Sequence, residues 1–394
     1  MQITQQHGDK TTGPTSQQDA NEFIYYYINL LKLFRDTKPI AEIDRLASEA
    51  MLLRRQRIYE FSQHLSHVES FFRTSSGAKP LEPKLTSWNL DQLQSLREMY
   101  GSLLLAVFHF GEHRHVLSDL ATLGIPFVAP IAKHAYFDAT AIFRNGPEAS
   151  KTAAMMLEVE RRDVGRRLLG GLKAGRIGVI YVDGNMGPDG HMVEESAVEV
   201  DFLGLKMRVK SGIGRLATSL SLPVVPMLAE RSGKGGTMLP VIVPRSSPKG
   251  AAREHEIVRI MQECYTTLGK AVSASPQDWE FAFCLHRWIS ADNSSQQSDR
   301  PTFVPTSSAK ARIDPKNVVY YSCPDGIYWL HIERQRAYKL PSWCGDIYHL
   351  LTKTPQEVRT LLTLLQRRAP INETTNIVEQ LHSLGLIDVA PDMQ

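Results

Sequence analysis

Short apolar runs alternate with longer amphipathic segments through the middle of the chain. The runs end at Gly, Pro or a carboxylate and predict strands, at Leu103–Phe110, Gly124–Pro130, Arg176–Asp183, Pro223–Leu228 and Met238–Val243. Helical periodicity between them predicts helices over Val116–Leu123, Ala149–Leu172, Ser211–Leu220 and Arg253–Val272. Strands interleaved with helices predict an α/β fold, with a central and largely parallel sheet flanked by helices.

The first 90 residues show helical periodicity only. Ser16 is a suitable N-cap for a helix over Gln17–Arg35, and further helices are expected over Ile40–Phe72 and Trp88–Tyr100. We expect the basic cluster Arg54-Arg-Gln-Arg57 to form a solvated face of the second helix. These residues therefore predict a helical N-terminal extension.

A change of composition separates the C-terminal part from the rest. A polar, aperiodic stretch indicates a linker, and a hairpin is expected across the turn sequence Cys-Pro-Asp-Gly, between Val318–Ser322 and Ile327–Glu333. Helices at about Cys344–Thr352, Thr354–Arg367 and Thr374–Leu384 complete a small α+β domain, which we expect to be winged-helix-like. The predicted organisation is an N-terminal helical region 1–90, an α/β domain 91–290, a linker 291–313 and a C-terminal module 314–390.

The charge, the cysteines and the apolar runs of the sequence disfavour several classes of function. The 394 residues carry a formal net charge of +3, without the concentrated basic face of a nucleic-acid-binding protein. The four cysteines are far apart and form no CxxC pair, which disfavours a zinc site and fits a reducing cytoplasm. No signal peptide or membrane-spanning run is found. The aromatic and basic residues of 23–34 leave peripheral contact with the inner membrane open, beside simple packing of that helix on its own domain.

The segment His109-Phe-Gly-Glu-His-Arg-His115 begins at the end of the apolar run 103–110. Because strand ends of open α/β sheets are where ligands bind, His109 is a candidate general base, with Glu112 or another carboxylate holding its tautomer. Three histidines within the segment also suggest a metal site, but the helical spacing and a fourth ligand are lacking. A plain polar loop is the other alternative.

Two further segments carry candidate chemistry. Asp183 closes an apolar strand and is followed by a Gly-rich loop to Gly190, which suits close approach of a substrate or is an ordinary turn. Arg208 and Lys210 precede Gly212, where a helix is expected to begin. Basic side chains beside a helix N-terminus suit a phosphate or a phosphopantetheine arm, although a solvated edge strand has the same pattern.

Taken together, these segments resemble the lysophospholipid and lipid A biosynthesis acyltransferase family, the late lauroyl/myristoyl transferases, over roughly residues 90–290. The matching segments are Phe108–Gly111, Asp183 with its loop and Val198–Gly204, Ser211–Ala217, Leu222–Pro226, and Ser275–Trp279 with His286–Trp288. The C-terminal module weakly resembles the small peptide-binding winged-helix proteins of the pyrroloquinoline quinone type. Its matching features are the hairpin, Ala337–Pro341, Thr354–Glu357 and Leu381–Asp388.

The resemblance implies transfer of an acyl group from an acyl-carrier-protein or acyl-CoA thioester to a hydroxyl or amine. The family's histidine is oriented by an acidic residue five positions later, where this chain has Arg114. Glu112 is the expected substitute, with Asp119 as the alternative. We expect His109 to be the base and Asp183 to shape the acceptor side. The residues expected to bind the donor are Gly111, Arg114, Arg208, Lys210 and Gly212.

The predicted function is a cytoplasmic acyltransferase that acts in specialised-metabolite or modified-peptide biosynthesis. It binds no cofactor or metal beyond its thioester donor, and its C-terminal module binds a peptide or carrier protein by strand addition. The alternative is a catalytically degenerate binding protein that kept the acyl or carrier site. A third hypothesis keeps the enzyme and replaces the acyl group with an aminoacyl group. DNA binding is not expected, because Thr374–Leu384 holds no Lys or Arg.

Overall fold

The computed structural model describes residues 17–74, 90–132, 153–183, 197–229, 239–245, 250–289, 309–323, 326–367 and 371–390. The chain forms two compact units. The terminal unit combines residues 1–47 with 291–394, and the central unit spans 48–290. Each unit has its own sheet and hydrophobic core.

A five-stranded sheet in the order β3-β2-β4-β1-β7 forms the centre of the central unit, and all its strand pairs are parallel. The strands are β1 (Leu104–Gly111), β2 (Phe127–Ile131), β3 (Ala154–Glu158), β4 (Ile177–Tyr181) and β7 (Val224–Ala229). Residues 104–108 of β1 are all buried, as expected for a strand with both faces covered. This confirms the predicted α/β fold with a parallel sheet.

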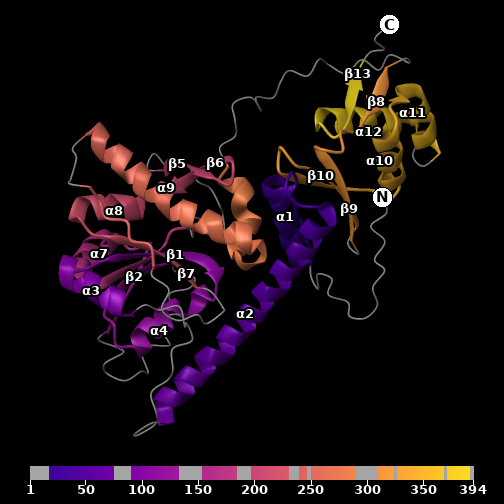
Figure 1. The fold of residues 1–394 in the computed structure, drawn as a ribbon. Coiled ribbons are helices and arrows are strands. Elements are labelled where there is room, and N and C mark those ends of the chain that lie inside the picture. Colours follow the sequence, from indigo (N-terminus) through magenta and orange to yellow (C-terminus); the bar gives the residue numbers. More distant parts are fainter. Residues whose placement is uncertain are drawn as a thin grey trace. The chain divides into compact units, whose positions relative to one another are not determined.

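Helices cover both faces of this sheet. Leu105 and Val107 of β1 share a core with α3 (Leu90–Tyr100) and α4 (Val116–Thr122). The alternate residue Phe108 packs edge-on against Tyr265 of α9 (Ala251–Ala274), on the opposite side of the strand from α4 (Figure 1). On α7 (Val164–Lys173), Gly171 lets the helix approach Val128 of β2 closely, because a Cβ there would lie 3.1 Å from the valine side chain. Helix α8 (Gly212–Leu220) packs against α9, where Gly214 lies close to Ile257.

A separate antiparallel hairpin of β5 (Ala197–Phe202) and β6 (Leu205–Lys210) packs beside α9. The chain then passes through the short 3-10 helices η2 (Pro276–Asp278) and η3 (Glu280–Arg287). An isolated bridge between Phe110 and Trp279 brings this segment against β1. The end of the central unit therefore folds back onto the strand that carries His109.

Two predictions about single elements are wrong. The expected helix over 149–172 contains strand β3 before α7 begins, because the apolar run Met155–Leu157 pairs with β2 at the sheet edge. The expected strand over 238–243 is reduced, within residues 239–245, to one bridge between Ile242 and Val224. Both errors come from short apolar runs, for which periodicity does not separate helix from strand.

The terminal unit contains a three-stranded antiparallel sheet in the order β11-β10-β9. Its strands are β9 (Val318–Cys323), β10 (Gly326–His331) and β11 (Arg336–Leu340), and β9 and β10 confirm the predicted hairpin. A second sheet joins β8 (Lys310–Arg312) with β12 (Gln356–Glu357) and β13 (Asp388–Ala390). The helices are α10 (Cys344–Lys353), α11 (Val358–Gln366) and α12 (Ile371–Ser383).

Helix α1 (Gln17–Phe34) belongs to this terminal unit, which differs from the predicted division into a separate N-terminal region. The rings of Phe23 and Tyr27 each lie 5.3 Å from that of Tyr321 on β9. Asn29 is fully buried and accepts a 2.9 Å hydrogen bond from Gln335. The aromatic face of α1 therefore packs on the sheet formed by β9, β10 and β11.

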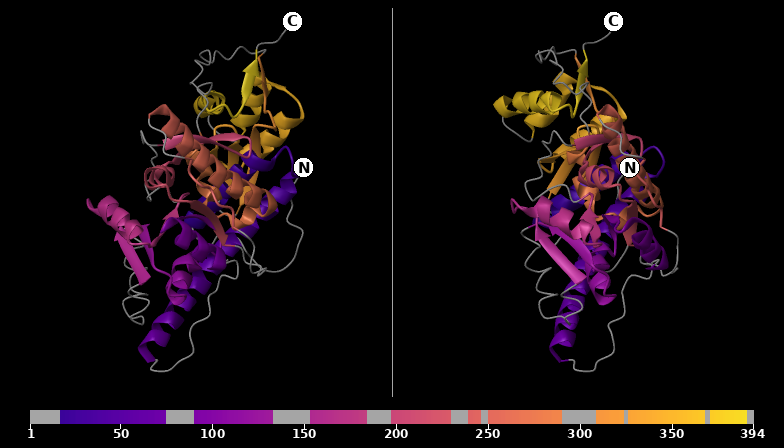
Figure 2. Two further views of the ribbon diagram at one scale, coloured as in Figure 1. Left: turned by 60° about the vertical axis from the view of Figure 1, so that its left-hand side comes forward. Right: turned by 90° about the vertical axis from the view of Figure 1, so that its left-hand side faces the viewer.

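Two observed elements, β8 and α2 (Ile40–Thr74), cross boundaries that were predicted from the sequence. Strand β8 lies inside the range predicted as linker, so only 291–308 of that range stays outside the described residues. Helix α2 is one continuous helix, drawn in indigo in Figure 2. Its residues from Ser48 onward belong to the central unit.

Candidate functional site

The carboxyl ends of β1 and β4 place His109 and Asp183 side by side. The two strands are parallel neighbours with Val107 opposite Tyr181, so residues two positions further along each strand meet at the same edge of the sheet. The backbone N–H of His109 donates to the Asp183 carboxylate, with N–O distances of 3.0 and 3.2 Å. The sheet register therefore brings together two residues that lie 74 positions apart.

Asp183 also holds the imidazole of His109. The Nδ1 atom of His109 lies 2.8 Å from Oδ1 of Asp183, whose side chain is 0% exposed. A carboxylate only accepts hydrogen bonds, so Nδ1 carries the proton and Nε2 of the neutral ring keeps its lone pair. With 19% of its side chain exposed, His109 can present that lone pair to a substrate as a general base.

Trp279 completes the surroundings of Asp183. Its indole N–H donates to Oδ2 over 3.1 Å, so the buried carboxylate accepts hydrogen bonds from three N–H groups. A buried charge is tolerated when it is hydrogen-bonded in this way. Trp279 reaches this position through its bridge with Phe110 on β1.

The carboxylate beside His109 is a different one from the Glu112 expected from the sequence. Among the described residues, Asp183 supplies the carboxylate bonded to the His109 imidazole, and no hydrogen bond or ion pair joins His109 to Glu112 or Asp119. Glu112 faces Nε of Arg57 at 3.6 Å and Nε2 of His115 at 4.0 Å, and Asp119 is buried in α4. Asp183 was expected on the acceptor side. The Gly-rich loop expected after it lies outside the described residues.

Arg114, which the sequence suggested as a donor-binding residue, forms a two-pronged ion pair with Glu280. Its Nη2 donates to Oε2 over 2.7 Å and its Nη1 to Oε1. Glu280, at the start of η3, is only 3% exposed. Burial by itself would raise the pKa of Glu280, but the hydrogen bond with His113 and the ion pair with Arg114 hold that pKa below its usual range.

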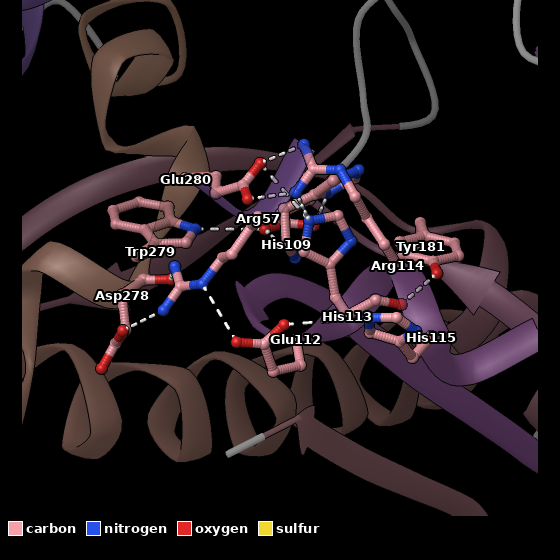
Figure 3. A network of polar contacts seen from close by, with 11 residues as sticks. Arg57, His109, Glu112, His113, Arg114, His115, Tyr181, Asp278, Trp279 and Glu280 are labelled. Atoms are coloured by element: carbon pink, nitrogen blue, oxygen red, sulfur yellow. Dashed lines mark hydrogen bonds and ion pairs between the residues drawn. The ribbon is translucent and has the colours of Figure 1, made fainter. Parts of the chain in front are cut away.

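His113 lies between this ion pair and His109. The rings of His113 and His109 are 4.6 Å apart, and Nε2 of His113 is 3.4 Å from Glu280 (Figure 3). Burial lowers the pKa of His113 to about 4, so the ring is neutral at pH 7. Tyr181 of β4 donates from its hydroxyl to the His113 carbonyl over 2.8 Å, and burial raises its own pKa above the usual range.

Arg57 corrects the expectation of a solvated basic face on α2. Its side chain is 2% exposed and pairs with Asp278, just before Trp279, while facing Glu112. Arg54 of the same cluster stacks on Phe283, with its guanidinium carbon 5.1 Å from the ring centroid. Two of these arginines therefore fasten α2 to the segments around the site.

Aromatic rings from η3 border His109. The Phe281 ring centroid lies 4.0 Å from that of His109, and Trp288 stacks behind Phe281 at an interplanar angle of 11°. Phe281 and Phe283 are half-buried, with their centroids 5.9 Å apart. This apolar border lies next to the candidate base.

The remaining predicted residues fall into two groups. Gly111 lies at the end of β1 with φ +60°, a conformation that favours glycine, and the chain then bonds from Glu112 N to Ala229 O of β7. Arg208 lies exposed on β6, Lys210 ends that strand and Gly212 begins α8. None of these three contacts His109 among the described residues, and their role with the donor stays a prediction.

The sequence did not single out Trp279, Glu280, Arg57 or Phe281 as site residues. The one available signal was the segment Ser275–Trp279, which was used for the resemblance only. Within the described ranges, no three His, Cys, Asp or Glu side chains form a metal-binding group. No helix in that part of the chain combines the length and apolar character needed to cross a membrane.

Comparison with known protein families gives one match for this chain. Residues 71–288 match the model of a family described as bacterial lipid A biosynthesis acyltransferase. That range contains His109 on β1, Asp183 two residues after β4, and Glu280 at the start of η3. A search of the curated proteins gave no match.

Proposed function

Because the chain belongs to the bacterial lipid A biosynthesis acyltransferase family, we propose that it transfers an acyl group from a carrier-protein or CoA thioester to a hydroxyl or amine. The observation that carries this proposal is the 2.8 Å contact between Nδ1 of His109 and the buried carboxylate of Asp183. That contact leaves Nε2 of a half-buried imidazole as a base at the end of a strand.

The reaction follows from this tautomer. The oxygen or nitrogen of the acceptor attacks the thioester carbonyl, and Nε2 of His109 takes the proton that this hydroxyl or amine loses. Asp183 stabilises the imidazolium that forms. The carbon–sulfur bond of the tetrahedral intermediate then breaks, and the leaving thiolate takes the proton back from His109. Atoms and charge balance without a bound cofactor.

The donor-binding residues are part of the proposal. Arg208 and Lys210, with the N-terminal amides of α8 from Gly212, suit the phosphates of CoA or of a phosphopantetheine arm. These thioesters are made in the cytoplasm, where we place the reaction. We keep peripheral contact with the inner membrane as part of this proposal.

We also propose that the terminal unit recruits a peptide or carrier protein. Strands β9 and β11 are the edges of its three-stranded sheet, and an open edge accepts an added strand through main-chain hydrogen bonds. A peptide partner would place the reaction in modified-peptide or specialised-metabolite biosynthesis. Isothermal titration of the full chain with apo and acylated carrier protein tests this recruitment, and CoA serves as the comparison.

The transferase is tested with a panel of acyl-CoA, acyl-carrier-protein and aminoacyl thioesters, read by mass spectrometry. We expect donor consumption by the wild type and by His255→Ala, an exposed histidine on α9, and its loss in His109→Ala. Turnover that persists in His109→Ala would exclude His109 as the base. Intact donors with every protein, together with tight carrier binding, would favour the alternative of a catalytically degenerate binding protein.

A further inference from the structure

A half-buried arginine and a buried glutamate lie near the His109–Asp183 pair without taking part in it. Arg114 of η1 (His113–His115) and Glu280 of η3 are joined by two hydrogen bonds, and their side chains are 20% and 3% exposed. His109, in contrast, contacts neither of them among the described residues. His113 lies between this ion pair and His109, and its Nε2 is 3.2 Å from Arg114 and 3.4 Å from Glu280.

The groups that face His113 come from three elements besides its own. They are His109 of β1, Tyr181 of β4 and Glu280 of η3, with Arg114 as its neighbour in η1. Only Glu280 is an anion, and alone it would favour a protonated His113. Nδ1 of His113 is buried and has no hydrogen-bond partner among the described residues. An imidazolium would therefore bury an N–H without an acceptor, which is unfavourable.

We propose that Arg114 and Glu280 are positioning residues that act through His113. Arg114 neutralises the buried Glu280 carboxylate, so that His113 stays uncharged against the ring of His109. The proposal rests on the acyl-transfer function, because it matters when His109 becomes an imidazolium. A second cation 4.6 Å away would oppose that step.

The variants separate charge from shape. Arg114→Gln leaves the Glu280 carboxylate without its guanidinium, Glu280→Gln leaves the guanidinium without its carboxylate, and the double variant removes both charges. Arg114→Lys keeps the cation. Arg259→Gln is the matched control, because it breaks another Arg–Glu pair of similar burial, with Glu256 in α9.

The first readout is histidine NMR on the full chain, with the His113 signal assigned from its loss in His113→Gln. We expect Arg114→Gln to raise the pKa of His113 from about 4 by about one to two units. Glu280→Gln should lower it, and the double variant should return it toward the wild-type value. Arg114→Lys and Arg259→Gln should leave the titration unchanged.

The second readout is the pH dependence of kcat/KM. In Arg114→Gln the rate should fall about two- to tenfold at pH 5 relative to its plateau, as a His113 pKa of about 5 to 6 implies, beyond any fall in the wild type, and the double variant should recover it. An unchanged His113 titration in Arg114→Gln, or a double variant no better than Arg114→Gln at pH 5, would overturn the proposal. If no donor is consumed by the wild type, the proposed function fails, and the NMR titration still decides this inference.

Discussion

Replacing Asp183 with Asn tests whether the orienting carboxylate has moved to the end of β4. The substitution keeps the volume of the side chain but changes its hydrogen-bonding capacity. The carboxylate accepts from His109 N, His109 Nδ1 and Trp279 Nε1. An amide has one acceptor oxygen and an NH₂ that can only donate. At least one of the three N–H groups would then face another donor.

The least costly rearrangement is a change of tautomer in His109. If Nδ1 loses its proton it can accept from the Asn NH₂, but the proton then resides on Nε2 and the base is lost. General-base catalysis contributes about 10²–10⁴ in rate, which corresponds to about 3 to 5 kcal/mol of activation free energy. We expect kcat to fall by that range while KM changes little, because the side chain of Asp183 is fully buried.

The assay is single-turnover acyl transfer by the wild type, Asp183→Asn and Asp201→Asn, an exposed carboxylate on β5. Near-UV circular dichroism shows whether the packing of Trp279 survives in each variant. If a folded Asp183→Asn variant transfers acyl groups within threefold of the wild type, then Asp183 does not orient the base. The same result would return Glu112 to consideration.

Three further predictions concern neighbouring groups. Trp279→Phe removes one charge-assisted hydrogen bond from buried Asp183, and should destabilise the fold by about 2 kcal/mol in urea titrations while lowering kcat; an unchanged midpoint would contradict it. Arg57→Met leaves Asp278 and Glu112 without their buried cation and should cost about 3 kcal/mol, against little change for the half-buried neighbour Arg55→Met. Burial lowers the pKa of His286 from 6.5 to about 4. The unfolded chain therefore binds a proton at this histidine at a higher pH than the folded chain does. The contribution of neutral His286 to the free energy of unfolding should be complete above pH 6.5 and fall by up to about 3 kcal/mol as the pH drops to 4. His286→Gln should remove part of that acid sensitivity in denaturation measured across this range.

The parallel sheet could be predicted because its strands are continuous apolar runs between helices. The candidate base could be predicted for a related reason, since His109 follows the most apolar of these runs. Asp183 was recognised as a carboxylate that ends a strand, but its partner was not. That pairing depends on β4 lying next to β1 in the sheet. Strand order is set by the tertiary packing of helices, which no local pattern encodes.

Charged residues were harder to place than apolar ones. Arg57 stands in a basic cluster of an amphipathic helix, where solvent exposure is the normal expectation. It is buried because Asp278 neutralises it from a position 221 residues away. Helix α1 gives a similar lesson, because its aromatic face could be recognised but its partner Tyr321 lies in the C-terminal sheet. Both outcomes depend on contacts between distant segments.

From the sequence, Arg114 stands at the position where the family resemblance expects the acidic residue that orients His109. The structure shows how the charges around the His109 imidazole are arranged instead. Glu280 and Arg114 pair with each other, burial disfavours the charged form of His113, and Asp183 is the carboxylate bonded to the His109 imidazole among the described residues. A histidine with one anionic partner is the requirement of the chemistry, whichever strand supplies the anion. An arginine at position 114 is therefore compatible with the proposed acyl transfer, because its ion pair with Glu280 offsets its positive charge near His109.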